Sequence, residues 1–305
     1  MQYIILGANG YVGSYIYRHM KKDNLKVIGT GHCREGEKDL VCFDALHDSI
    51  TNVVKLVTER EKTAIICIAQ TNIDQCKLDY DLSRQVNVTF VQSATEKLLQ
   101  EGFHVIYFST DNVFDGMRGN YSESDKPNAI NQYGKMKQEV EECFLEKFPE
   151  VCIFRIPKVL SAEREKQNLL TDFESKLNGE EVRCIKNNCI SIIAKEDLYQ
   201  ACLISSKQKM HGLYNLSCGE QYSRKQLAEK FFMSIGVDYK KIVELELEKF
   251  GFSDARPLNI GLDNSKFRKA TGYEFITYDM LLDQYRIVNG YGDNRKTVDM
   301  IKKIM

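Results

Sequence analysis

A tyrosine and a lysine stand at Tyr133 and Lys137 in the segment NQYGKMK. On a helix, residues at i and i+4 lie one above the other, so the two side chains can face a common substrate. A cationic neighbour stabilises phenolate, which makes a tyrosine a better proton donor near neutral pH. Such pairs are also common on solvated helix faces, so the chemistry depends on what else converges on this segment.

Hydroxyl groups stand just upstream, where the apolar run HVIYFST ends. The carboxyl ends of parallel strands line the ligand crevice of a doubly wound sheet, so Ser109, Thr110 and Asp111 are predicted to face that crevice. The following helix is predicted over residues 132–148. Its first two turns place Tyr133 and Lys137 close to Thr110.

The predicted helix carries an apolar stripe made by Met136, Val140 and Phe144. This spacing is typical of a helix packed on a sheet. Tyr133 and Lys137 are expected to lie off the stripe.

A glycine turn follows the first apolar run in YIILGANGYVG. Residues 3–6 are predicted as a strand, and Gly7, Gly10 and Gly13 lead into a helix. Glycines keep the turn tight and let the backbone approach a pyrophosphate at the helix N-terminus. Because the motif lies between a strand and a helix, it predicts a dinucleotide site.

The end of the second strand, LKVIGTG, bears on the type of dinucleotide. An acidic residue there would bind the ribose 2′-hydroxyl of NAD, but the chain continues with Gly31, His32, Cys33 and Arg34. Arg34 is a candidate for the 2′-phosphate, which favours NADP(H) over NAD(H). Since two glutamates follow closely, Arg34 is alternatively one charge of a polar loop.

Composition excludes several classes of function. The 305 residues include 43% apolar and 28% charged types, with 42 basic and 43 acidic side chains interspersed. No stretch approaches the roughly 18 uncharged apolar residues of a membrane span, and no basic stripe is available for nucleic acid. Neither a membrane nor nucleic acid is expected as a partner, and a homodimer is one assembly that the sequence allows.

The ten cysteines are interpreted as reduced thiols of a cytoplasmic protein. Several of them, such as Cys67 and Cys152, lie in apolar runs, where a thiol behaves as a small hydrophobic group. Cys184 and Cys189, with the scattered histidines, do not reproduce a zinc-ligand spacing, so no metal site is expected.

The alternation of apolar runs and helical segments predicts an α/β Rossmann fold with a doubly wound parallel sheet and a smaller C-terminal substrate-binding domain. Residues 1–158 are assigned to the NAD(P)-binding domain, with strand elements returning near 190–218. Residues 159–305 are assigned mainly to substrate binding.

The motifs GANGYVG, FSTDNVFDG and YGKMK resemble those of the extended short-chain dehydrogenase/reductases. The segments AQTNIDQC at 69–76, YSESDKP, HGLYNLSCGEQYSRKQLAEKF at 211–231 and ARPLNIGLD at 255–263 are similar to the dTDP-4-dehydrorhamnose reductase branch. This similarity runs in the same order from residue 1 to about residue 285.

The resemblance implies roles for individual residues. It implies catalysis by Thr110, Tyr133 and Lys137, with Lys137 also bonding the nicotinamide ribose. Together with the glycine loop, it implies that Tyr11, Asp44 and Ala69 bind the cofactor.

Other residues are expected at the substrate. Ser109 offers a second hydroxyl beside Thr110, and Asn112 follows the end of the same predicted strand. Arg256 is a candidate for the sugar-nucleotide diphosphate, because a guanidinium matches phosphate oxygens, or else it is a surface arginine beside a proline turn. Asn87 matches a family asparagine on the neighbouring helix and is either part of a proton relay or a polar residue of that helix.

The predicted function is NADPH-dependent reduction of a 4-keto-deoxysugar nucleotide, with Tyr133 as the general acid. A 4,6-dehydratase needs an acid and a base, and in the related dehydratases these residues directly follow the threonine; here Asn112 is an amide and cannot be that base. Two alternatives stay open: a nucleotide-sugar epimerase, and a non-catalytic NADP-binding regulatory subunit like the β subunit of methionine adenosyltransferase. Ile66, Gln70 and Asn112 depart from the reductase pattern, so the sugar is not defined.

Overall fold

The computed structural model describes residues 1–32 and 39–291. A seven-stranded sheet forms its centre, with every pair of neighbouring strands parallel. From one edge to the other its strands are β10 (Gly212–Asn215), β6 (Cys152–Ile156), β5 (His104–Thr110), β4 (Lys62–Ile66), β1 (Gln2–Leu6), β2 (Lys26–Gly31) and β3 (Val41–Cys42). The direction of winding reverses between β1 and β4, which is the ligand-binding point of such sheets.

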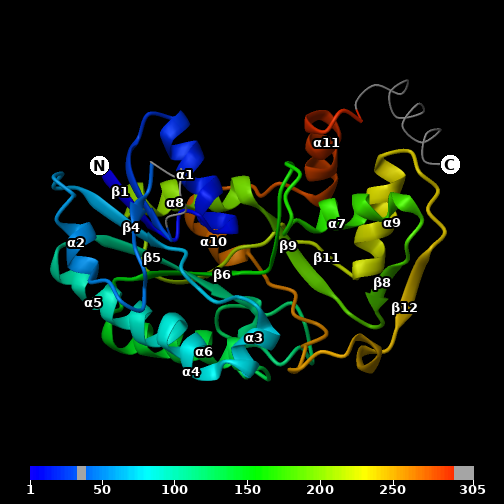
Figure 1. Cartoon of the computed structure of the whole chain (residues 1–305), viewed down its shortest axis with the longest axis horizontal. Coiled ribbons are helices and arrows are strands. Elements are labelled where there is room, and N and C mark those ends of the chain that lie inside the picture. Colours follow the sequence, from blue (N-terminus) through cyan, green and yellow to red (C-terminus); the bar gives the residue numbers. More distant parts are fainter. Residues whose placement is uncertain (33–38, 292–305) are drawn as a thin grey trace.

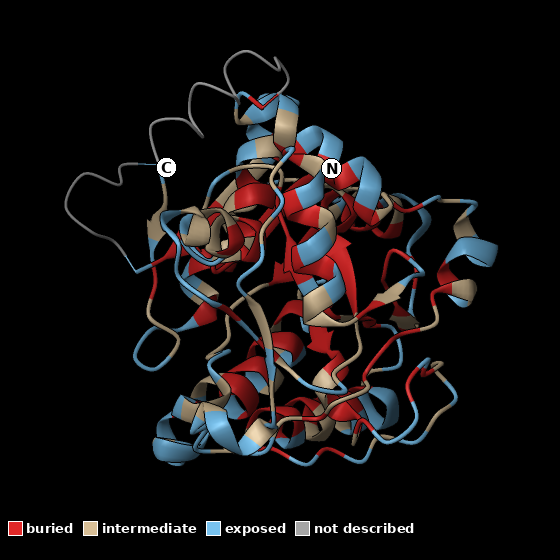
Figure 2. Cartoon of the chain, turned by 90° about the vertical axis from the view of Figure 1, so that its right-hand side faces the viewer, coloured by how far each residue is buried: buried red, intermediate tan, exposed pale blue. Residues whose placement is uncertain are grey.

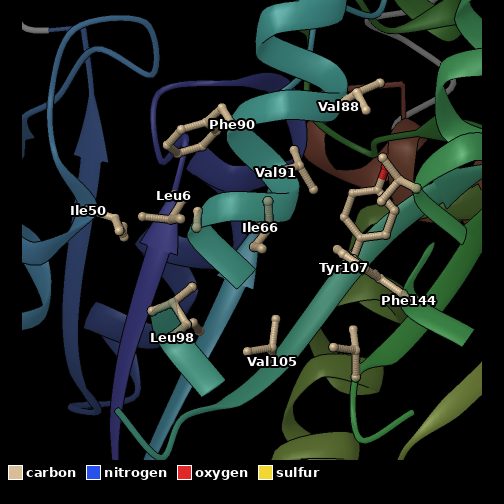
Figure 3. Packing of buried hydrophobic residues seen from close by; sticks show 14 of the residues in the cluster. Leu6, Ile50, Ile66, Val88, Phe90, Val91, Leu98, Val105, Tyr107 and Phe144 are labelled. Carbon is tan, nitrogen blue, oxygen red and sulfur yellow. The ribbon is translucent and has the colours of Figure 1, made fainter. Parts of the chain in front are cut away.

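Both faces of this sheet are buried, which explains why its strands are continuous apolar runs. In β1, Ile4 and Leu6 belong to one core and Tyr3 and Ile5 to the other. Figure 3 shows the first core, where Leu6, Ile66 and Tyr107 lie beneath the adjacent helices.

Helices cover each face of the sheet (Figure 1). One face packs against α2 (Ile50–Val54), α5 (Val91–Gln100) and α6 (Gln132–Lys147), and the other against α1 (Tyr11–Lys22), α8 (Lys195–Gln208) and α10 (Ser265–Thr271). Short elements lead into α5: α3 (Ile73–Leu78), α4 (Tyr80–Arg84) and a π-helical turn, η1 (Gln85–Phe90). The 3-10 turn η2 (Asp111–Val113) directly follows β5.

A second group of elements lies beside the carboxyl edge of the large sheet (Figure 1). It holds a three-stranded sheet of β11 (Gln221–Tyr222), β9 (Ile190–Ala194) and β7 (Lys158–Leu160), and the pair β12 (Ile242–Leu245) and β8 (Val182–Ile185). The helices are α7 (Leu169–Ser175), α9 (Arg224–Ser234) and α11 (Tyr278–Val288), with 3-10 turns η3 (Lys176–Asn178) and η4 (Leu247–Phe250). These elements enclose a third core, and Figure 2 shows that exposed residues lie on the outer faces of the helices.

The predicted α/β Rossmann class is confirmed by this arrangement. Of the strand elements expected near 190–218, β10 joins the large sheet and β9 joins the three-stranded one. Within residues 1–32 and 39–291, no helix is both long and apolar enough to cross a membrane.

Candidate active site at the carboxyl edge of the sheet

The turn between β1 and α1 is shaped by its glycines. Gly7 has a φ of +87°, and a Cβ at Gly13 would lie 2.2 Å from the Gly7 carbonyl oxygen. The N-cap Gly10 has no capping side chain, and the first turn of α1 contains no acidic residue. The positive end of α1 is therefore open to an anion, and these residues fit the pyrophosphate of a dinucleotide.

Gly13→Ala is expected to abolish measurable cofactor binding. The added methyl group would collide with the Gly7 carbonyl, so α1 would have to move away from the turn that is predicted to hold the pyrophosphate. Titration of NADPH by fluorescence measures the affinity, and circular dichroism reports whether the variant is folded. A folded variant with wild-type NADPH affinity would contradict this role of the turn.

Other predicted cofactor residues lie at the same edge. Asp44 follows β3, and the amide of Leu46 and the His47 ring lower its pKa by hydrogen bonding to its carboxylate. Ala69 lies in the loop after β4. Arg34 lies outside the described residues.

The loop that carries Ala69 is held by Asn87, which lies in the π-helical turn η1. The Asn87 side chain accepts from the Gln70 amide at 2.8 Å and donates to the Gln70 carbonyl at 2.9 Å. π-Helical turns are frequent at functional sites. Asn87 thus fixes the backbone next to the predicted cofactor site, and it is fully buried.

Tyr11 points away from the turn that precedes it. Its ring lies 3.5 Å from the Lys195 ammonium, measured to the ring centroid, and its hydroxyl donates to the Val159 carbonyl at 3.5 Å. The Tyr11 side chain is therefore engaged by β7 and α8, and its role at the cofactor stays a prediction.

The start of α6 is fixed against the end of β5. Asn131 caps the helix by accepting from the Gly134 amide at 2.8 Å and donates to the Asn112 side chain at 3.1 Å. A Cβ at Gly134 would lie 2.0 Å from the Asn112 carbonyl oxygen, so only glycine permits this approach. The close packing holds Tyr133 next to Thr110.

Tyr133 and Lys137 lie on the buried face of α6, so the expectation that they lie off its apolar stripe was wrong. Their exposed fractions are 9% and 3%, and Tyr133 belongs to the same core as Met136 and Val140. Positions 133, 137, 140 and 144 of a helix share one face. Burial raises the pKa of Tyr133, whereas the Thr110 hydroxyl lowers it by hydrogen bonding to the phenolate form.

Lys137 is a buried cation held by the end of β5. Its ammonium donates to the Phe108 carbonyl at 2.8 Å and lies 6.0 Å from the centroid of the Tyr133 ring. Burial lowers the pKa of Lys137 to about 8, although the nearby Glu141 carboxylate opposes the shift. The charge of Lys137 therefore lies inside the protein between the Tyr107 and Tyr133 rings, nearer to Tyr107 at 4.5 Å from its ring centroid.

Thr110, Asp111 and Asn112 form a hydrogen-bonded group at the end of β5. The Asp111 carboxylate accepts from the Thr110 hydroxyl at 3.1 Å and from the Asn112 side-chain amide at 2.9 Å. Burial raises the pKa of Asp111 to about 7, while these hydrogen bonds lower it. Near neutral pH the group therefore contains a carboxyl that is partly protonated.

The pH dependence of stability is expected to carry the signature of Asp111. Its pKa is higher in the folded protein than in the unfolded chain, so stability is lost as the pH rises from about 4 to about 7. Asp111→Asn keeps an acceptor for both hydrogen bonds and cannot ionise. Its unfolding free energy relative to wild type should therefore rise across this range by a value on the order of 4 kcal/mol. Urea unfolding at several pH values measures the difference, and a flat or falling difference would contradict it.

The Ser109 side chain hydrogen-bonds to a buried ion pair that the sequence did not indicate. The Ser109 hydroxyl donates to Glu141, and Glu141 pairs with Arg155 at 2.6 Å, with both charged side chains 1% exposed. Glu141 lies one turn beyond Lys137 on α6. The spacing of Tyr133, Lys137 and Glu141 on one helix face could have drawn attention to this glutamate, but nothing local marks Arg155 as its partner.

Arg256 is also engaged within the protein. Its guanidinium pairs with Asp74 at 2.8 Å, donates to the carbonyls of Asp254 and Ala255, and lies 4.3 Å from the centroid of the Phe252 ring. Its contacts match the alternative in which it fixes the turn before Pro257.

A doubly wound parallel sheet, a glycine turn after β1 and a threonine, tyrosine and lysine together at the carboxyl edge define the dinucleotide-binding fold of the short-chain dehydrogenase/reductases. The chain belongs to the family described as the RmlD substrate binding domain, whose profile matches residues 1–286. The family predicted from the motifs is confirmed.

Two relatives illustrate the range of this family. The chain is 24% identical over 274 residues to methionine adenosyltransferase 2 subunit beta of Danio rerio, covering 86% of this chain and 83% of that protein. It is 29% identical over 172 residues to a probable low-salt glycan biosynthesis reductase of Haloferax volcanii, covering 56% and 57%.

Solved structures share the fold. A dTDP-4-dehydrorhamnose reductase of Clostridium acetobutylicum has a TM-score of 0.81 at 24% identity, covering 95% of this chain and all of that one. The enzyme of Bacillus anthracis, in complex with NADP, has a TM-score of 0.80 at 23% identity, covering 94% and 100%. A UDP-glucose 4-epimerase of Thermotoga maritima with UDP-glucose has a TM-score of 0.78 at 18% identity, covering 95% and 100%.

Proposed function

We propose that the protein is an NADPH-dependent reductase of a 4-keto-deoxysugar nucleotide. The observation that carries this proposal is the convergence of Thr110, Tyr133 and Lys137 at one sheet edge, next to a glycine turn that fits a dinucleotide. Family membership supports the same class of chemistry.

The reaction needs a hydride at the carbonyl carbon and a proton at the oxygen. The bound nicotinamide would supply the hydride. Tyr133 donates its hydroxyl proton to the carbonyl oxygen and is left as phenolate, which solvent reprotonates after the turnover. The Thr110 hydroxyl, which donates to Asp111 in this structure, would turn its proton to the same oxygen, and the Lys137 charge stabilises the phenolate.

Lys137 gives this site a defined upper pH limit. The pKa of Lys137 is lowered to about 8, so its stabilising charge is present below that pH and is lost above it. We expect the rate to fall as the pH rises through 8, and a rate that is flat from pH 7 to pH 9 would contradict this role of Lys137.

NADPH is proposed over NADH because no acidic residue follows β2 at Gly31 and His32. Residues 159–305 are proposed to bind mainly the substrate. The protein is proposed to act in the cytoplasm, where its thiols stay reduced.

The proposal is tested by following NADPH oxidation with dTDP-4-keto-6-deoxyglucose and with its epimerised product, the 4-keto-rhamnose nucleotide. Turnover with either substrate, faster with NADPH than with NADH, supports the reductase. Tight NADPH binding without reduction of either keto-sugar would reject it.

A regulatory subunit is the second candidate, favoured by the similarity to methionine adenosyltransferase 2 subunit beta over most of both chains. The buried Thr110, Tyr133 and Lys137 weigh against it, because a purely regulatory subunit needs no proton donor. A nucleotide-sugar epimerase shares Tyr133 and Lys137, and it would convert UDP-glucose without net oxidation of added cofactor.

A further inference from the structure

Lys158 is the first residue of β7, directly beyond the catalytic edge. In the large sheet Thr110 of β5 pairs with Ile156 of β6, and the chain reaches Lys158 two residues later. The glycine turn lies after β1, which is separated from β6 by β4 and β5. Lys158 thus lies just beyond the carboxyl end of β6, and the next residue, Val159, accepts from the Tyr11 hydroxyl at the start of α1 at 3.5 Å.

Strand register shows which way Lys158 points. Lys158 pairs with Ile192 and Leu160 with Ala194, and these apolar partners all belong to the third core. Paired residues of neighbouring strands project to the same face of a sheet. The Lys158 side chain therefore extends to the face covered by α7 and α9. Lys158 is the first residue of β7 and is exposed, whereas Val159 and Leu160 are buried.

The charges around Lys158 come from three elements. Asp172 of α7 and Arg224 of α9 form an ion pair at 2.7 Å, and both act on Lys158, as does Asp111 from the catalytic edge. Loss of hydration lowers the pKa of Lys158 and the Arg224 charge lowers it further, whereas the Asp172 and Asp111 carboxylates raise it, although part of the side chain stays exposed. Lys158 therefore lies near an ion pair that joins α7 to α9.

Lys158 and Arg224 keep unused donors. Within the part of the chain that the structure describes, Lys158 makes neither a hydrogen bond nor an ion pair, and the buried Nε of Arg224 has no hydrogen-bond partner. Arg256, by contrast, already donates to Asp74 and to two backbone carbonyls. Lys158 is therefore a better candidate than Arg256 for binding an anion.

We propose that Lys158, flanked by the Arg224–Asp172 pair, binds an anionic oxygen group of the substrate, either a carboxylate on the hexose or the diphosphate of the nucleotide. The inference rests on the proposed function for the identity of the ligand. An ammonium bonds carboxylate and phosphate oxygens through charge-assisted hydrogen bonds, so both sources share this chemistry. Lys158 is then a specificity-determining residue of the site.

The test is calorimetric binding to the full chain saturated with NADPH, so that the glycine turn is filled. The probes are UDP-glucose, UDP-glucuronate and inorganic pyrophosphate. Lys158→Met removes the charge and Lys158→Arg retains it. Lys207→Met is the matched control, because Lys207 is exposed near the end of α8.

We expect Lys158→Met to weaken binding about tenfold or more, with Lys158→Arg and Lys207→Met within about threefold of wild type. Equal losses for all three probes identify the diphosphate, and a loss confined to UDP-glucuronate identifies the carboxylate. Unchanged affinities in Lys158→Met, equal losses in Lys207→Met, or no binding of any probe to wild type would overturn the inference. Lys158-dependent binding without reduction of a keto-sugar nucleotide would reject the reductase and leave the anion site standing.

Discussion

Tyr133→Phe is expected to lower kcat for ketone reduction by about 10²–10⁴-fold, because a positioned general acid contributes that much. The proton donor is lost, whereas the ring still fills the core between α6 and the sheet. NADPH affinity should stay within about threefold of wild type, since the glycine turn lies elsewhere. Steady-state kinetics and NADPH titration separate the two effects.

Tyr107→Phe is the matched control. Tyr107 is buried, its ring centroid lies 4.5 Å from the Lys137 ammonium, and its hydroxyl has no hydrogen-bond partner among residues 1–32 and 39–291. Phenylalanine keeps the ring that packs against Lys137, so activity should be retained. If both variants lost activity equally, packing around Lys137 would explain the loss, and Tyr133 would not be the acid.

The shape of the glycine turn was predictable because its determinants are local. Gly7, Gly10 and Gly13 lie within one strand, turn and helix, and the structure places them in close backbone contact. The approach of Tyr133 to Thr110 was also predictable, because parallel strands bring their carboxyl ends to one edge.

The surroundings of these residues could not be predicted, because they depend on contacts between distant positions. Lys137 was placed off the buried stripe because a lysine counts as polar in a helical pattern. The Phe108 carbonyl, 29 residues away in sequence, satisfies its ammonium and allows burial. Glu141 can likewise be buried because it forms an ion pair with Arg155. Arg256 forms an ion pair with Asp74, which lies 182 residues away in sequence.

Arg155→Met is expected to destabilise the protein by about 3–5 kcal/mol, because it leaves the Glu141 carboxylate buried without its partner. Glu141 and Arg155 are among the most deeply buried charges described, and the Arg155 guanidinium also lies 4.8 Å from the centroid of the Phe114 ring. Urea unfolding measures the loss. Lys186→Met, which breaks the exposed pair with Glu246, should cost less than about 1 kcal/mol.

The double variant Arg155→Met/Glu141→Gln separates two contributions to the free energy of unfolding: the penalty for burying an unpaired carboxylate and the stabilisation by the intact ion pair. Glutamine is neutral and still accepts from Ser109, so most of the stability should return, as it does when both members of a buried pair are neutralised. Removing the Glu141 charge also removes the influence that raises the pKa of Lys137. The fall of the rate at high pH should therefore begin at a lower pH in the double variant. If stability returned with an unchanged pH profile, the ion pair would support the fold alone; if stability did not return, the loss in Arg155→Met would come from packing.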